Sequence, residues 1–244
     1  MHPYSVTWDA EAVALVPTLC ILYVLLLRVY PVPRWRMALF ALSQALILGV
    51  FVSPLETIAL HYLLTAHLLQ NVVLAEWAPP LFMLGLPPRF LAGLTPYRFF
   101  QVVANPFVAL PLWLLTYFAW HLPWAYDAAL RHPTTLLHVE HLCYFLTGCL
   151  LWWPVVHDGP WRLGDGGRAA YLFAAFVLAS PLGLLLALLP NPVYSFYEQA
   201  PRLWGLSPLG DQQLAGATMA GEQAVVFFFA CSVFFLRFVE TQAR

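Results

Sequence analysis

The sequence predicts an all-α membrane protein, folded as a polytopic bundle of seven transmembrane helices with the N-terminus outside and the C-terminus inside. Three observations lead to this fold class. Of the 244 residues, 61% are hydrophobic and only 9% are charged, whereas about a quarter of the residues in a soluble domain are charged. The apolar residues form runs of membrane-spanning length, and the arginines gather on one side of these runs. We expect residues 1–244 to form a single domain.

Seven runs meet the length requirement, because an α-helical span needs roughly 20 mostly apolar residues. The first run is preceded by acids and no arginine or lysine, so we interpret it as a permanent span and not as a signal peptide. Proline-containing or polar turns separate several of the others. The expected spans are 12–30, 35–53, 57–78, 103–121, 134–156, 168–189 and 210–236.

The third span carries an unusual set of polar residues and prolines. It continues into HLLQNVVLAEWAPPLFMLGLPP at 67–88. Because proline disfavours helical backbone in the residue before it, we expect the Pro-Pro pairs at 79–80 and 87–88 to end this helix. Glu76 is then expected near the inner membrane interface, within reach of water.

Arginine placement predicts the orientation, because inner loops of membrane proteins are enriched in positive charge. With the N-terminus outside, only Arg131 and Arg202 fall in outer loops. The inner loops hold the rest, namely Arg28, Arg34, Arg36, Arg89, Arg98, Arg162, Arg168, Arg237 and Arg244. The net charge of −1 provides no basic surface for nucleic acid. The four cysteines form no CxxC pair and indicate neither a disulfide framework nor a zinc site.

With this topology, most of the buried ionisable residues fall in the outer half of the bilayer. Ionisable groups in a membrane are costly and point to function. Imidazole binds copper, zinc, iron and nickel, and the thioether of Met219 would favour Cu(I). The histidines at this depth come from the third, fourth and fifth spans and are His61, His67, His121, His138 and His141.

Two helix faces carry the strongest metal-binding pattern. His138 and His141 are spaced i,i+3 and share a face, while Gln70 and Asn71 accompany His67. Metal-bound histidines usually donate their second ring nitrogen to a neighbouring group, and the carboxylates that we expect in that position are Asp127, Glu140 and Asp211. The alternative stays open that single histidines are helix-to-helix hydrogen-bond partners and that Met219 only packs.

Three blocks together resemble the CtaG-type cytochrome c oxidase assembly factor family. They are HLLQNVVLAEWAPPLFMLGLPP, WHLPWAYDAALRHPTTLLHVEHLCYFLTGCLLWWPV at 120–155, and DQQLAGATM at 211–219. The resemblance implies a seven-span protein that supplies copper to haem-copper oxidases. In this sequence Asn71 and Ala220 stand where many members have histidine and tryptophan. The positions carried over from the family's blocks are His67, His121, His138, His141, Asp211 and Met219.

The resemblance and the histidine pattern predict a bacterial inner (plasma) membrane assembly factor that is not an enzyme. It would bind copper, as Cu(I), in the outer half of the bilayer and deliver it. The expected partners are cytochrome c oxidase subunits, membrane lipid and a soluble copper donor on the outer side, with no nucleic acid. Two alternatives remain: a structural accessory subunit of a respiratory oxidase without metal, and a haem-binding membrane electron carrier.

Overall fold

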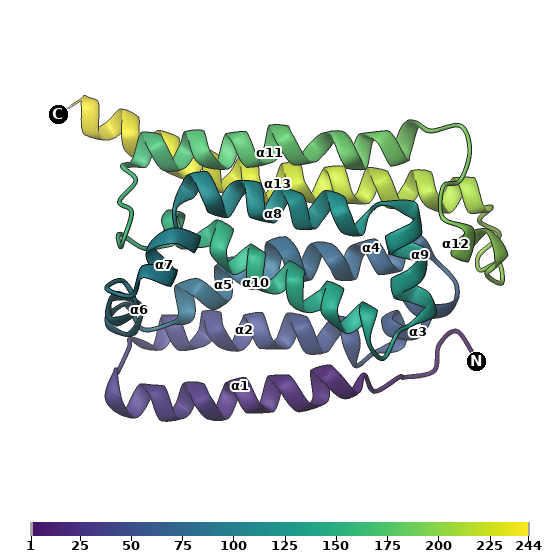
Figure 1. Cartoon of the computed structure of the whole chain (residues 1–244), viewed down its shortest axis with the longest axis horizontal. Coiled ribbons are helices and arrows are strands. Elements are labelled where there is room, and N and C mark those ends of the chain that lie inside the picture. Colours follow the sequence, from purple (N-terminus) through teal and green to yellow (C-terminus); the bar gives the residue numbers. More distant parts are fainter. Residues whose placement is uncertain (1, 244) are drawn as a thin grey trace.

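The computed structural model describes residues 2–243, which form an elongated bundle with the two chain ends at opposite ends of its long axis (Figure 1). All regular secondary structure in this range is helical, which confirms the all-α prediction. Within the described residues, five helices are long and apolar enough to cross a membrane. They are α1 (Ala10–Val29), α2 (Arg34–Phe51), α10 (Leu136–Val156), α11 (Asp165–Leu188) and α13 (Pro208–Gln242).

The expected fourth span corresponds to α8 (Pro106–Trp120), which is apolar but shorter than these five helices. The remaining short helices lie near the ends of the bundle (Figure 1). At the end that holds the C-terminus lie α6 (Pro88–Leu94) and α7 (Arg98–Val103), and at the end that holds the N-terminus lie α3 (Pro54–His61), α9 (Pro123–Arg131) and α12 (Ser195–Gln199).

The expected third span is broken into several pieces. The first piece, α3, ends at His61. The chain is extended at Leu63, and a new helix, α4 (Leu64–Val72), begins at the next residue. The chain then passes through a π-helical turn, η1 (Val73–Trp77), into α5 (Ala78–Gly85). Each segment packs against at least one of the long helices α2, α10 and α13.

The prediction that Pro79 and Pro80 end this helix was wrong. Both prolines lie in the first turn of α5, and the helix continues to Gly85. Prolines lack the N–H groups that would bond to the carbonyls four residues earlier, and the wider π-helical turn lies directly before them. A π-turn of this kind is rare and is often found at functional sites. The second pair behaves differently, because Pro87 precedes a new helix, α6.

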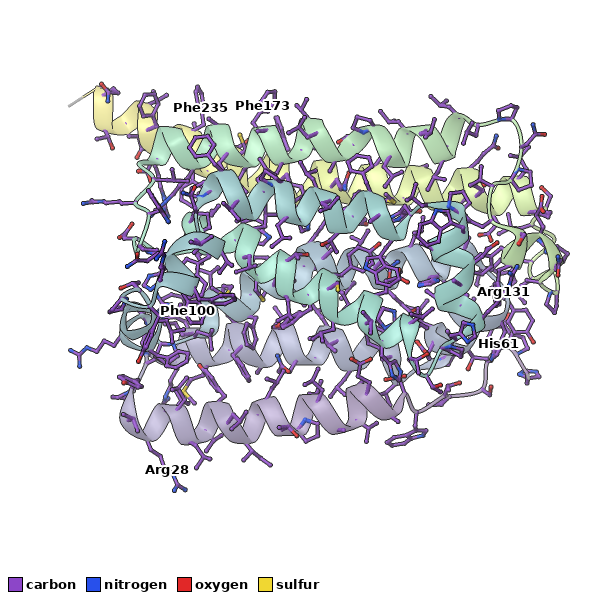
Figure 2. All side chains as sticks on the ribbon, viewed as in Figure 1. Arg28, His61, Phe100, Arg131, Phe173 and Phe235 are labelled. Atoms are coloured by element: carbon purple, nitrogen blue, oxygen red, sulfur yellow. The ribbon has the colours of Figure 1, made fainter. Side chains whose placement is uncertain are left out.

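The outer surface of the bundle is apolar along its length. Side chains such as Phe173 on α11 and Phe235 on α13 project away from the core (Figure 2) and are 53% and 54% exposed. Apolar exposure on this scale is typical of surfaces that are covered by another apolar phase. Arg28 and Arg131 lie at opposite ends of the bundle (Figure 2). Together with the helix lengths, this distribution fits a helical membrane protein.

Glycines allow two close helix contacts that shape the core. A Cβ atom on Gly216 of α13 would lie 2.5 Å from the backbone oxygen of Gly183 on α11. A Cβ atom on Gly148 of α10 would lie 2.5 Å from the backbone oxygen of Ala75 in η1. Small residues at such crossings let helix backbones approach closely in membranes. The second contact holds α10, which carries Glu140 and His141 in its N-terminal half, against the broken third segment.

Candidate functional site

Three of the predicted histidines are buried in one region of the core. His67 on α4, His121 at the C-terminal end of α8 and His141 on α10 are 1%, 5% and 7% exposed. The ring centroids of His67 and His141 are 6.2 Å apart, with the rings nearly perpendicular. Tyr126 of α9 lies beside two of them, with its centroid 5.1 Å from that of His67 and 5.8 Å from that of His121. We call His67, His121 and His141 the buried histidine group.

The tautomer of His67 follows from its hydrogen-bond partner. Its Nδ1 lies 3.1 Å from the hydroxyl of Tyr197. That hydroxyl donates its single proton to the carbonyl of Ala59 at 2.6 Å, so it accepts a hydrogen bond from Nδ1–H of His67. The lone pair is therefore on Nε2, which is buried and has no hydrogen-bond partner within residues 2–243.

The same reasoning applies to His121. Its Nδ1 lies 2.7 Å from the backbone carbonyl oxygen of Tyr117, which can only accept a hydrogen bond. Nδ1 therefore carries the proton, and the hydroxyl of Tyr144 lies 3.2 Å from the same nitrogen. As in His67, the lone pair is on a buried Nε2 that lacks a partner in the described part of the chain.

His141 completes the group. Its Nε2 is likewise buried and unpartnered among the described residues, and its ring packs against Phe51 of α2 with centroids 4.8 Å apart. An imidazole nitrogen binds a metal ion at about 2 Å and lies about 1.2 Å from its own ring centroid, so two rings on opposite sides of one ion have centroids up to about 6.4 Å apart. The 6.2 Å separation of His67 and His141 is just within that limit.

His138 and His61 lie outside the buried histidine group, and Met219 is a core residue. His138 is on the face of α10 that meets α1, where its Nε2 lies 3.4 Å from Asp9 Oδ2 and 3.7 Å from Glu11 Oε2. His61 is exposed at the end of the bundle (Figure 2). Met219 is 1% exposed and lies in the apolar core.

The carboxylates that we expected to hold imidazole nitrogens bond mainly to backbone and amide groups. Asp211 of α13 accepts hydrogen bonds from the backbone N–H of Leu64 at 2.7 Å and of Thr65 at 3.1 Å, which caps the N-terminus of α4. Asp127 caps the N-terminus of α12 in the same way. The partners of the imidazole nitrogens are instead the Tyr197 hydroxyl and the Tyr117 carbonyl.

Glu140 and Asn71 are bonded to each other. The Asn71 side-chain amide donates to Glu140 Oε1 at 3.0 Å, and Glu140 is fully buried. Its Oε2 has no partner in residues 2–243. Asn71 thus joins α4 to α10 close to His67 and His141.

Glu76 is also fully buried, so the expected position at a water-accessible interface was wrong. Its Oε1 accepts a hydrogen bond of 3.0 Å from Gln223 of α13, which also donates to the Tyr117 hydroxyl. Because the backbone carbonyl of Tyr117 accepts the bond from His121, Tyr117 connects the polar groups beside the π-turn to the buried histidine group.

Sequence reasoning did not identify the tyrosines around the site or the two acids at the start of α1. The only available signal was the aromatic content of 16%, which fits membrane anchoring equally well. The tyrosines whose side chains contact histidines of the group are Tyr117, Tyr126, Tyr144 and Tyr197.

A family model described as cytochrome c oxidase caa3 assembly factor (CtaG) matches residues 20–241. Neither a curated protein nor a solved structure matches the chain. The matched range includes the whole buried histidine group, and it begins after Asp9 and Glu11. Because this range spans nearly the whole chain, the protein belongs to the cytochrome c oxidase caa3 assembly factor family.

Proposed function

We propose that the protein binds copper through the buried histidine group and passes it to a haem-copper cytochrome c oxidase during assembly. The observation that carries this proposal is the set of three buried Nε2 atoms without hydrogen-bond partners among the described residues. An unpaired buried polar atom costs about 1–3 kcal/mol, and coordination to a metal ion would satisfy such an atom. The ligand atoms of the three described rings do not all lie within 4.8 Å of one another, so a bound ion would draw the rings closer together. The role is one of binding and transfer and is not catalytic.

The ligand types suit a reversible copper site. Imidazole binds copper well, and in two of the three rings the proton is held on Nδ1 by a neighbouring group, which leaves Nε2 ready to coordinate. Glu140 directly precedes His141 in the sequence and has one buried oxygen without a partner in the described chain. As a carboxylate, it would offset the single charge of Cu(I), which is the oxidation state that we expect.

The space around the histidines argues against the haem-binding alternative. The cavity that adjoins His141 has a volume of about 40 Å³. Pockets for drug-sized and cofactor-sized ligands measure about 300–1,000 Å³. A metal ion fits beside His141 without rearrangement, whereas a porphyrin would require helices to separate.

For the topology, we propose seven membrane crossings in a bacterial plasma membrane, with the N-terminus outside. The broken segment from α3 to α5 and the shorter α8 are then the third and fourth crossings. The excess of arginine at the C-terminal end of the bundle supports this orientation. The buried histidine group would lie toward the outer side, where a soluble copper donor and the oxidase subunits could reach it.

The decisive experiment measures copper per chain after loading the purified full-length protein. We expect His67→Ala and His141→Ala to lose most of the bound copper, and His121→Ala to lose part of it. His61→Ala is the matched control, because His61 is exposed and outside the group. If copper content stays the same in all four variants, the proposal fails. Co-purification with an oxidase at fixed stoichiometry without copper would then identify an accessory subunit.

A further inference from the structure

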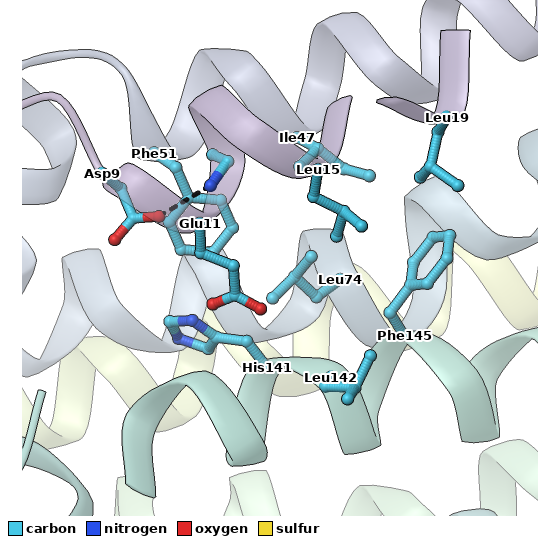
Figure 3. A pocket seen from close by; sticks show the side chains of 11 residues that line it. Asp9, Glu11, Leu15, Leu19, Ile47, Phe51, Leu74, His141, Leu142 and Phe145 are labelled. Atoms are coloured by element: carbon cyan, nitrogen blue, oxygen red, sulfur yellow. Dashed lines mark hydrogen bonds between the residues drawn. The ribbon is translucent and has the colours of Figure 1, made fainter. Parts of the chain in front are cut away.

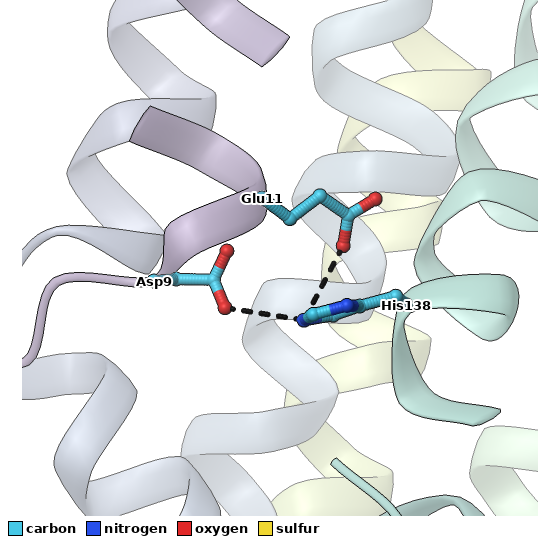
Figure 4. A group of neighbouring side chains, drawn as sticks. All are labelled: Asp9, Glu11 and His138. Atoms are coloured by element: carbon cyan, nitrogen blue, oxygen red, sulfur yellow. Dashed lines mark ion pairs between the residues drawn. The ribbon is translucent and has the colours of Figure 1, made fainter. Parts of the chain in front are cut away.

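A second group of metal-ligand side chains lies where α1 meets α10. Asp9 and Glu11 at the start of α1 face His138 in the first turn of α10 (Figure 4). One ligand atom from each lies within 4.8 Å of the other two. Among the described residues, this is the one group of three histidine, cysteine or acidic side chains with that spacing.

The spacing of these atoms suits coordination better than a direct hydrogen bond. The distances of 3.4 Å and 3.7 Å from His138 Nε2 to the two carboxylates exceed the usual length of an N–H···O bond, which is roughly 2.7–3.2 Å. Ligands at about 2.1 Å in a tetrahedral zinc-type site are separated by about 3.4 Å. A small cation between the three groups would therefore need little movement of the side chains.

Asp9 can hold a cation without giving up its structural role. Its Oδ1 accepts a hydrogen bond of 2.8 Å from the backbone N–H of Ala12 and caps α1. The other oxygen, Oδ2, faces His138. The side chains of His138, Asp9 and Glu11 are 29%, 17% and 26% exposed, so an ion from the surrounding solution can reach them.

A cavity leads from these acids toward the buried histidine group. Asp9, Glu11 and His141 are its polar lining residues, and the rest of the wall is apolar (Figure 3). Its volume of about 40 Å³ has room for about three water molecules. His141 is 7% exposed, and its buried Nε2 lacks a partner among residues 2–243. The two acids and this imidazole therefore line one partly open cavity.

We propose that Asp9, Glu11 and His138 form an entry site for a divalent transition-metal ion, which the cavity connects to His141. Two carboxylates and one imidazole suit borderline ions such as Zn²⁺ and Cu²⁺. The ligand set depends on residues that precede the range matched by the family model. Binding of a divalent ion by these three side chains is independent of the Cu(I) site proposed for the buried histidine group, and it involves no change of oxidation state.

The test uses the full-length protein in detergent micelles, with Zn²⁺ as a redox-inert probe in calorimetry. We expect one Zn²⁺ site whose affinity falls at least about tenfold in Glu11→Gln and in His138→Ala. Asp9→Asn keeps an oxygen for the cap of α1, and its Zn²⁺ affinity should fall by a similar factor. Glu198→Gln and His61→Ala are matched controls at the same end of the bundle and should bind as the parent does.

A spectroscopic readout complements the affinities. With one equivalent of Cu²⁺, electron paramagnetic resonance should show coupling to a single imidazole nitrogen, and His138→Ala should abolish it. Unchanged Zn²⁺ affinity in the Asp9, Glu11 and His138 variants would overturn the entry site, because the three groups would then form only an ion pair. His67→Ala separates the two proposals: it should leave this Zn²⁺ site intact, and its effect on copper loading reports on the buried group alone.

Discussion

The hydroxyl of Tyr197 accepts a hydrogen bond from Nδ1 of His67 while it donates its own proton to the Ala59 carbonyl. Tyr197 lies in α12, outside the long helices, and yet it determines which nitrogen of a core histidine is free. Removing the hydroxyl leaves Nδ1–H without its acceptor and allows the ring to change tautomer or turn.

Tyr197→Phe should therefore weaken copper binding without unfolding the protein. Loss of a group that holds a metal-bound histidine typically lowers metal affinity by about 10–100-fold, and we expect a change in this range. Competition with a copper chelator of known affinity measures it. Tyr97→Phe is the control, because Tyr97 is 63% exposed and lies near the other end of the bundle. Equal affinities in the two variants would contradict the role of Tyr197.

Asp211 caps the N-terminus of α4, and its removal should destabilise the bundle. Asp211→Ala leaves two backbone N–H groups of Leu64 and Thr65 without partners, which should lower the free energy of unfolding by about 2–4 kcal/mol. Asp211→Asn retains one acceptor oxygen and should cost less. Thermal unfolding in detergent gives the comparison. Asp158→Ala, at a position where the side chain is 68% exposed, should change stability little.

Two glycines of α13 should respond in opposite ways to alanine. In Gly216→Ala the new methyl group meets the backbone of α11, and overpacking of this kind costs about 1–3 kcal/mol. At Gly221 no atom beyond the neighbouring backbone of its own helix lies within 4 Å of the place that a methyl group would take, so Gly221→Ala should be neutral or stabilising by up to about 1 kcal/mol. Melting temperatures of both variants test the close contact of α11 with α13. If Gly221→Ala lost as much stability as Gly216→Ala, the close contact of Gly216 with α11 would not explain the loss.

The proposed orientation can be tested with a membrane-impermeant maleimide on intact cells. Arg28 and Arg131 lie at opposite ends of the bundle (Figure 2), and both are exposed. Arg131→Cys should be labelled from outside, whereas Arg28→Cys should be labelled only after the cells are opened. The parent protein sets the background, since its four cysteines are partly exposed. The reverse labelling pattern would overturn the orientation.

The long helices were predictable because their apolar runs have the length of a membrane span. The expected spans at 12–30, 35–53, 134–156 and 168–189 agree with α1, α2, α10 and α11 to within three residues at each end. The broken third segment was not predictable. Its restart at Leu64 depends on a cap supplied by Asp211 of a distant helix, and the continuation through Pro79 depends on a π-turn packed against Gly148.

For the site, the sequence indicates the residue types but not their partners. His67 and His141 were expected together because their helices carry polar faces at one depth, and the structure places their rings side by side. His138 is only three residues from His141, and yet it faces Asp9 because α1 packs on that side of α10. Spacing along a helix limits which residues share a face, but it does not say which neighbouring helix covers each part of that face.

The bond between Asp211 and Leu64 also bears on biogenesis. The two residues are 147 positions apart in the chain, so the N-terminus of α4 lacks this cap until the start of α13 has been synthesised and has reached α4. His67 sits in the first turns of α4, and Tyr197, which orients it, is likewise synthesised late. A nascent chain therefore cannot order the start of α4, which carries His67, before Asp211 and Tyr197 have been synthesised.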